Sequence, residues 1–260
     1  MSQFQKVFDV LDLFTEERTT LSAEEVSDLL AVSRPTAFRY LRWLTETGLV
    51  SRLSGRYAIG ARIMELDYRS RRSDPLLLAA RDVMARLTEE TQCSAMLSGV
   101  FGDKVVNIHQ DEHRAHVSAS FGRGRALPPF RGAASKVVLA HLGSARLKRL
   151  FDDHGNEPDV QALGQDWPEF SKYFRTIRQR GFYVSKGEVD SDVAGVAAPL
   201  FNAEGGVAGA LTLLLQLPHG EFLDTDRLGN LVMERAREIS GRLAQSPRTA
   251  DEAAAVETPA

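Results

Sequence analysis

The sequence predicts an α+β fold with two domains, a small helical domain closed by a β-hairpin and a larger domain built on an antiparallel sheet. Apolar residues recur at helical spacing in three short segments before Gly48, and two alternating runs follow around Ser54 and Gly55. Beyond residue 90, short β-like runs with hairpin turns come in blocks between helical segments. The expected divisions are residues 1–60 for the small domain, 61–74 for a linker helix, 75–246 for the larger domain and 247–260 for a disordered acidic tail.

Composition narrows the possible functions. The chain has 260 residues, of which 43% are apolar and 26% charged, so it can build ordinary globular cores. Its net charge of −3 means that any nucleic-acid-binding surface must be a local patch. A single cysteine, Cys93, excludes an internal disulfide framework. We expect no signal peptide, no membrane span and no cofactor, and we expect the cytoplasm as the compartment.

The first two helices are marked by their apolar spacing and by one cap. The first carries its apolar residues at Phe4, Val7, Phe8, Leu11 and Phe14. Ser22 and Glu25 form an S-x-x-E capping box at the start of the second. Together these signals predict two short amphipathic helices.

A third helix follows after a tight turn. Ser33 can cap it, Pro35 suits its first turn, and Gly48 suits its end. Two short helices joined in this way are typical of a helix-turn-helix, whose second helix presents its N-terminal residues to base edges in the DNA major groove. The expected DNA contacts on this helix are Ser33, Arg34, Pro35, Thr36 and Arg39, flanked by Tyr40 and Arg42. We expect Phe38 and Trp43 to lie in the core.

The hairpin around Ser54 and Gly55 is expected to form a wing, with Arg52 and Arg56 near the DNA backbone. Residues 33–56 carry five arginines and one acid, a local net charge of +4, whereas residues 1–32 carry two basic residues and seven acids, a net of −5. Positive charge therefore gathers on the element expected to face DNA. A protein-interaction module without DNA affinity remains the alternative at this point.

The second domain is expected to mix helices and antiparallel strands. Its expected helices cover residues 76–90, 133–142, 144–151, 166–180 and 221–243, and its strands 94–101, 105–110, 115–121, 182–185, 193–201 and 207–217. Residues 208–215 are apolar on both faces, which predicts a strand in the middle of the sheet.

Four stretches of sequence resemble the IclR-type regulator family. They are "LSAEEVSDLLAVSRPTAFRYLRWLTETGLVSR" with "GRYAIG" in the first domain, and "LPPFRGAASKVVLA" and "RGFYVSKGEVDSDVAGVAAPLFNAEGGVAGALTL" in the second. The resemblance covers the chain up to about Gln245. It implies a winged helix-turn-helix, a linker helix and a GAF-like domain that binds a small-molecule effector. It also implies a homodimer, or a dimer of dimers, on a palindromic double-stranded DNA operator.

The resemblance also implies where the effector binds, between the central sheet and the helix that begins near Ala133. Carried over, the contacts fall on Ala133, Ala134, Ser135, Ser185, Gly195, Thr212 and Leu214. Ser135 stands where the family usually has glycine, Ser185 where it has an acid, Gly195 where cysteine occurs, and Leu214 where serine occurs. These departures suggest a larger or more apolar ligand, such as an aromatic or branched carboxylate. The alternative is that they only repack the core.

Other signals predict neither metal binding nor catalysis. His109, His113 and His116 match no strong zinc spacing. Ser135 and Lys136 together suggest a nucleophile with an amine base. The sequence shows no oxyanion arrangement and no third partner for them, so an enzyme is the less favoured alternative. Glu188 and its acidic neighbours are expected to form a solvated loop.

Overall fold

The computed structural model describes residues 3–113, 122–217 and 224–245. The chain divides into two compact units, Met1–Asp74 and Pro75–Ala260. The predicted strand at 115–121, the start of the last predicted helix at 221 and the predicted tail at 247–260 lie outside the described residues. No helix among the described residues is long and apolar enough to cross a membrane.

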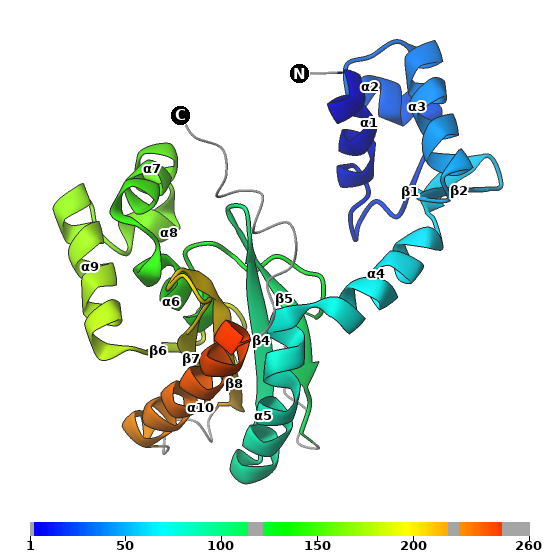
Figure 1. The fold of residues 1–260 in the computed structure, drawn as a ribbon. Helices are drawn as coiled ribbons and strands as arrows, with labels where there is room; N and C mark the ends of the chain where they lie inside the picture. Colours follow the sequence, from blue (N-terminus) through cyan, green and yellow to red (C-terminus); the bar gives the residue numbers. More distant parts are fainter. Residues whose placement is uncertain (1–2, 114–121, 218–223, 246–260) are drawn as a thin grey trace. The chain divides into compact units, whose positions relative to one another are not determined.

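The first unit is a helix-turn-helix with a small sheet. Its helices are α1 (Gln3–Asp12), α2 (Ala23–Leu29), α3 (Arg34–Glu46) and α4 (Arg62–Ser73), and its strands are β1 (Thr20–Leu21), β2 (Val50–Leu53) and β3 (Arg56–Ile59), in the order β1-β3-β2 (Figure 1). Ser54 and Gly55 turn the β2–β3 hairpin with φ of 48° and 86°. The predicted hairpin is thus confirmed.

The caps of the first unit follow the sequence in part. The Glu25 amide donates to Ser22 Oγ at 3.1 Å and the Ser22 amide donates to Glu25 Oε2 at 2.6 Å, so the predicted capping box is confirmed. Ser33 occupies the N-cap position of α3 but makes no side-chain cap bond. Its hydroxyl instead lies 2.9 Å from Thr36 Oγ1.

The second unit is a five-stranded antiparallel sheet with helices on both faces. Its strands are β4 (Ser94–Phe101), β5 (Lys104–Asp111), β6 (Tyr183–Lys186), β7 (Val193–Phe201) and β8 (Val207–Gln216), in the order β5-β4-β8-β7-β6. Its helices are α5 (Pro75–Thr91), α6 (Ala133–His141), α7 (Ser144–His154), α8 (Pro158–Gln161), α9 (Trp167–Arg180) and α10 (Thr225–Gln245). The central place of β8 confirms the mid-sheet strand.

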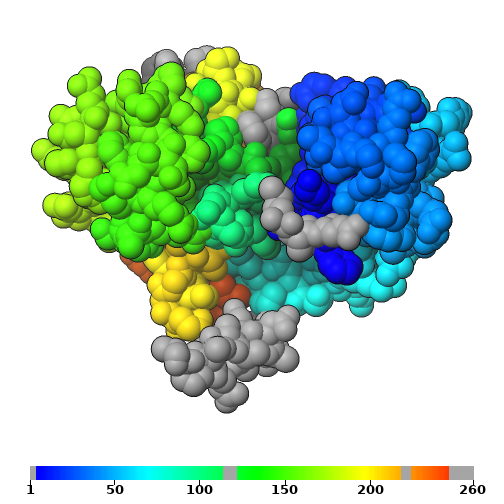
Figure 2. Space-filling view, turned by 90° about the horizontal axis from the view of Figure 1, so that it is seen from above, coloured from blue at the N-terminus to red at the C-terminus, as the bar shows by residue number. Residues whose placement is uncertain are grey.

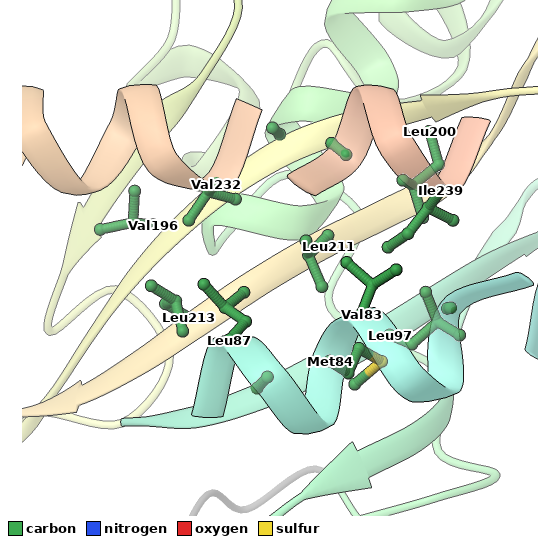
Figure 3. Close-up of a cluster of buried hydrophobic side chains, with 14 of the residues drawn as sticks. Val83, Met84, Leu87, Leu97, Val196, Leu200, Leu211, Leu213, Val232 and Ile239 are labelled. Carbon is green, nitrogen blue, oxygen red and sulfur yellow. The ribbon is translucent and has the colours of Figure 1, made fainter. Parts of the chain in front are cut away.

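The two faces of the sheet hold separate cores. Helices α5 and α10 pack on one face through residues such as Leu87 and Val232, which meet Leu211 and Leu213 of β8 (Figure 3). Helix α6 packs on the other face and is covered in turn by α9. The side chains of α7 to α9 form the outer surface on that side (light green in Figure 2). Because side chains alternate along each strand, successive residues of β7 and β8 serve different cores.

Candidate functional site

Helix α3 of the first unit separates an inner face from an outer one. Ala37, Tyr40, Leu41 and Leu44 are buried in the core of the unit. The outer side chains are exposed, and we call them the basic face: Arg34, Pro35, Phe38, Arg39, Arg42 and Thr45. The spacing of 3.6 residues per turn places these residues along one side of the helix. This side carries three guanidinium groups and, at its C-terminal end, one carboxylate, that of the exposed Glu46, which lies 3.3 Å from the Arg42 Nε.

Two sequence expectations on α3 are corrected by burial. Tyr40 is 2% exposed and packs in the core, so it is no flanking DNA contact. Phe38, expected in the core, is 48% exposed. The helical positions explain both, since Tyr40 shares the side of Leu41 and Leu44 whereas Phe38 shares the side of Arg34 and Arg42. Trp43 packs against the core in part, as predicted.

The basic face and the hairpin enclose a groove. It has a volume of about 500 Å³ and is lined by Pro35, Phe38, Arg39, Arg42, Thr45, Arg52 and Tyr57. The Arg39 guanidinium lies 5.5 Å from the centre of the Trp43 ring, and that of Arg52 lies 5.9 Å from the centre of the Tyr57 ring. These contacts hold the two charges in place by cation–π attraction. An anion entering the groove would meet three arginines.

Arg56 differs from the other arginines of this region. Its guanidinium donates to Thr20 Oγ1 at 3.0 Å and to the Thr20 carbonyl at 3.1 Å, and it lies 2.7 Å from Glu25 Oε2. The pKa of Glu25 is lowered, mainly by the hydrogen bond from the Ser22 amide. Desolvation opposes this shift, and the charge and hydrogen bond of Arg56 lower the pKa further. Arg56 therefore ties β3 to β1 and α2, and most of its donors are occupied within the unit.

In the second unit, all seven residues expected to contact an effector line one cavity. The cavity has a volume of about 60 Å³ and is also lined by Met96, Leu127, Pro128, Arg131, Gly132, Val189, Asp190 and Val193. Strand register brings part of this set together, because Ser185 pairs with Gly195 and Gly195 pairs with Leu214. Three neighbouring strands thus present one row of residues beneath the start of α6.

The polar groups at this cavity are arranged around the N-terminus of α6. Helix α6 has no side-chain cap, and Ala133, Ala134 and Ser135 of its first turn are buried. The first amides of a helix have no partner within it, so this end is positively polarised. Ser135 Oγ and Thr212 Oγ1 are buried and have no hydrogen-bond partner among the described residues. Such groups are costly unless something fills the cavity and bonds to them.

A carboxylate from a neighbouring loop is fixed beside the same helix end. Glu188 Oε2 lies 2.7 Å from Lys136 Nζ and accepts from the Gly132 amide at 2.8 Å. Tyr183 donates to Glu188 Oε1 at 2.8 Å and accepts from Tyr173 at 2.8 Å. Burial, followed by these hydrogen bonds, raises the pKa of Tyr183 far above its usual value, so it stays a neutral donor.

The fixed position of Glu188 corrects the expectation of a solvated acidic loop. The loop forms one wall of the cavity through Val189 and Asp190. Lys136 is 5% exposed on a helix of otherwise small and apolar residues, and a buried lysine requires a carboxylate partner. That lysine was the signal in the sequence that could have identified the pair.

The space at Gly195 favours the repacking alternative over a larger ligand. A Cβ added there would lie 3.1 Å from Ser185 Oγ, 3.4 Å from the Ala133 Cβ and 3.5 Å from Thr212 Cγ2. The neighbouring side chains therefore already occupy most of the space that a side chain at this position would need. The cavity gains little volume from this glycine.

Two of the three histidines singled out in the sequence lie among the described residues and contact polar groups of the protein. His109 Nε2 lies 3.0 Å from Asp111 Oδ1, and the His113 amide donates to Ser94 Oγ at 3.2 Å. His116 lies outside the described residues.

Comparison with known proteins gives the family. Residues 4–54 match the IclR helix-turn-helix domain, and residues 71–241 match the C-terminal domain of bacterial IclR transcriptional regulators. A helix-turn-helix head with a separate α+β effector domain defines a transcription regulator. The chain belongs to the IclR family of bacterial transcriptional regulators.

Individual relatives agree with this assignment. The chain is 26% identical over 211 residues to the Escherichia coli regulator XynR, covering 80% of this chain and 84% of XynR. It is 23% identical to the E. coli regulator KdgR, covering 82% of this chain and 81% of KdgR. The curated relatives are named as transcriptional regulators, not as enzymes.

Solved structures share the fold. An IclR regulator from Alicyclobacillus acidocaldarius superposes with a TM-score of 0.76 at 22% identity, covering 92% of this chain and 98% of that one. An IclR homologue from Microbacterium hydrocarbonoxydans, solved in complex with 4-hydroxybenzoate, gives 0.72 at 21% identity, covering 94% and 100%.

Proposed function

We propose that this regulator binds a palindromic operator as a homodimer, or as a dimer of dimers, and that a small organic acid in the cavity modulates this binding. The basic face is the observation that best supports DNA binding. Its residues are exposed, and the opposite side of the same helix already fills the core of the unit. The rival function, a protein-interaction module, gives no reason for three arginines around one groove.

The side chains of the basic face have different roles in this proposal. Arg34, Thr36 and Arg39 contact base edges near the N-terminus of α3, where Ser33 and Pro35 start the helix against the DNA. Arg42 and Arg52 contact phosphates on either side of the groove. Arg56 acts indirectly by holding the hairpin against α2, since its guanidinium is engaged by Thr20 and Glu25.

The effector proposed is a small carboxylate rather than an aromatic one. The first-turn amides of α6 have no partner within the helix and so favour a negative charge, and Ser135 and Thr212 offer two buried hydroxyls beside it. An apolar cavity of roughly 150 Å³ accepts benzene, whereas this one has about 60 Å³. The size thus favours a ligand of a few carbon atoms, although the 4-hydroxybenzoate complex of a distant relative means that an aromatic acid must be tested.

The effector acts on DNA binding through unequal affinity for two arrangements of the dimer. A coupling free energy of about 1–3 kcal/mol, equivalent to a change of roughly 5- to 150-fold in operator affinity, is enough for a useful switch.

The DNA-binding proposal is tested by Arg39→Ala in the full chain. We expect operator affinity to fall by about 1–3 kcal/mol and discrimination between operator and random DNA to shrink. Fluorescence anisotropy at two salt concentrations measures both. Arg149→Ala is the control, because Arg149 is also exposed but belongs to the second unit. Unchanged discrimination in Arg39→Ala would contradict the assignment of base contacts.

The effector proposal is tested by thermal shift with glyoxylate, pyruvate, benzoate and 4-hydroxybenzoate at matched concentrations. A ligand that binds the folded state raises the melting temperature with its occupancy. We expect the two small acids to give the larger shifts. Larger shifts with the two aromatic acids would overturn the size argument.

A further inference from the structure

Phe38 is an exposed aromatic side chain in the centre of the basic face. It is 48% exposed and lies one helical turn after Arg34 and one turn before Arg42. The apolar side of α3 is already complete without it, since Ala37, Tyr40, Leu41 and Leu44 fill the core. The packing of its own unit therefore does not explain why a phenyl ring stands at this position.

The surroundings of Phe38 specify what can cover it. Its groove is also lined by Arg39, Arg42 and Arg52, so a partner must carry negative charge. The same partner must offer an apolar group beside that charge, because covering a phenyl ring is favourable in proportion to the apolar area removed from water. The DNA major groove has this combination, with phosphates along both edges and the C5 methyl group of thymine on its floor.

We propose that Phe38 contacts the C5 methyl group of a thymine in each operator half-site and so selects a T·A pair next to the bases contacted by Arg34 and Arg39. The inference rests on the proposed DNA-binding function and adds a specificity-determining residue to it. Arginines at the same helix face recognise hydrogen-bonding edges, whereas Phe38 recognises the one apolar group that distinguishes thymine from the other bases.

The experiment removes one thymine methyl group of the operator at a time. Each thymine of a half-site is exchanged for deoxyuridine, which removes only the methyl group, and affinity for the full-length protein is measured by anisotropy. We expect one position per half-site to lose about fourfold in affinity, the effect of withdrawing a single buried methyl group. Other thymines should be replaceable without effect.

The variant Phe38→Ala completes the test. We expect it to bind the thymine operator about tenfold more weakly and to make no distinction between thymine and deoxyuridine at the sensitive position. Phe101→Ala is the control, because Phe101 is 55% exposed but belongs to the second unit. It should keep both the affinity and the fourfold preference for thymine.

Each other outcome has a distinct meaning. Specific operator binding that no deoxyuridine weakens in the wild-type protein overturns the role of Phe38 while the proposed function stands. A change of oligomeric state in Phe38→Ala, seen by light scattering, together with insensitivity to deoxyuridine in the wild type, also overturns it and assigns Phe38 to a protein contact. Absence of sequence-specific binding in the wild type overturns the proposed function itself. A wild-type scan in which no thymine is sensitive overturns the role of Phe38 even if the variant does not fold.

Discussion

At the scale of single residues, we expect removal of the Thr212 hydroxyl to raise the stability of the protein and to lower its affinity for the effector. This hydroxyl is buried without a partner among the described residues, and it lies at the cavity. We expect Thr212→Val to raise the free energy of unfolding by up to about 1 kcal/mol, because an unsatisfied group is removed without loss of volume. We expect effector affinity to fall about fivefold, the loss of one hydrogen bond worth about 1 kcal/mol.

Thr88 provides the matched control for this prediction. Its hydroxyl is also buried and has no partner among the described residues, but Thr88 lies on α5, on the opposite side of the sheet from the cavity. Thr88→Val should stabilise the protein similarly and leave effector affinity unchanged. Urea unfolding and calorimetric titration measure the two quantities. Equal ligand affinity in Thr212→Val and the wild type would remove Thr212 from the site.

Residue-level prediction from sequence succeeded where periodicity decided the outcome and failed where residue type was used instead. Phe38 was expected in the core because aromatic residues usually are, although its position in the helix already placed it beside Arg34 and Arg42. Tyr40 was expected near DNA because it neighbours Arg39, although its position matched the buried side. Successive residues on a helix lie about 100° apart, so position outweighs residue type.

At the scale of elements, helix α10 contains two glycines whose surroundings differ. A Cβ at Gly229 would overlap the ring of Phe182, whereas a Cβ at Gly241 would have no heavy atom of the described residues within 4 Å. Alanine is normally better than glycine inside a helix by about 1 kcal/mol. We expect Gly241→Ala to stabilise the protein by up to that amount and Gly229→Ala to destabilise it by about 1–3 kcal/mol through overpacking.

Both α10 variants are measured by urea unfolding monitored at Trp167. The chain has two tryptophans, and Trp43 lies in the first unit, so a Trp43→Phe background restricts the signal to the second unit. Stabilisation by Gly229→Ala would show that α10 packs less closely on Phe182 than described.

The C-terminal end of α6 makes stability depend on pH. Burial is the main effect that lowers the pKa of His141, and the nearby Arg178 lowers it further, against an opposing hydrogen bond with the Val137 carbonyl. The unfolded chain takes up a proton as the pH falls through about 6.5, while the folded chain does so only at lower pH. The contribution of His141 to stability is therefore present above pH 6.5 and lost as the pH falls.

We expect His141→Gln to reduce the difference in unfolding free energy between pH 7.5 and pH 5.5. Urea unfolding at the two pH values measures it in the same Trp43→Phe background. A difference equal to that of the wild type would mean that other groups carry the acid sensitivity of this unit.

The sequence predicted well the elements that carry a clear apolar pattern of their own. It did not predict a short strand that forms only by pairing with a strand distant in the chain. The apolar run of β7 appears in the structure with its predicted bounds, Val193–Phe201. Strand β1 has only two residues, Thr20 and Leu21, and exists through its pairing with Ala58 and Tyr57 of β3. So short a segment has no periodicity to detect, and only the folded partner specifies it.

At the scale of the whole molecule, the proposed dimer makes operator binding depend on half-site spacing. Two recognition helices related by two-fold symmetry bind half-sites separated by whole turns of DNA, about 10–10.5 base pairs each. We expect an insertion of five base pairs at the operator centre to reduce affinity by at least tenfold, and an insertion of ten to restore part of it. Anisotropy with the full chain measures this, and equal affinity for all three operators would argue against a paired arrangement.

The cavity is the part of the molecule that sequence alone predicts least well. The resemblance to the family predicted which seven residues meet there, but not that Glu188 is held beside the helix end by Lys136 and Tyr183. Nor did it predict the size of the cavity, which depends on how closely Ser185, Ala133 and Thr212 pack around Gly195. This closeness depends on the packing of several elements at once.

Because side chains alternate along the central strands, substitutions at the cavity and substitutions in the opposite core fall at different positions. Gly195 and Leu214 line the cavity, whereas their chain neighbours Val196 and Leu213 hold α5 and α10 on the opposite side. Substitutions at alternate positions can therefore alter which metabolite is detected while the opposite layer keeps its packing. A library that varies Ser185, Gly195 and Leu214 alone is accordingly a compact starting point for biosensors with new chemical inputs.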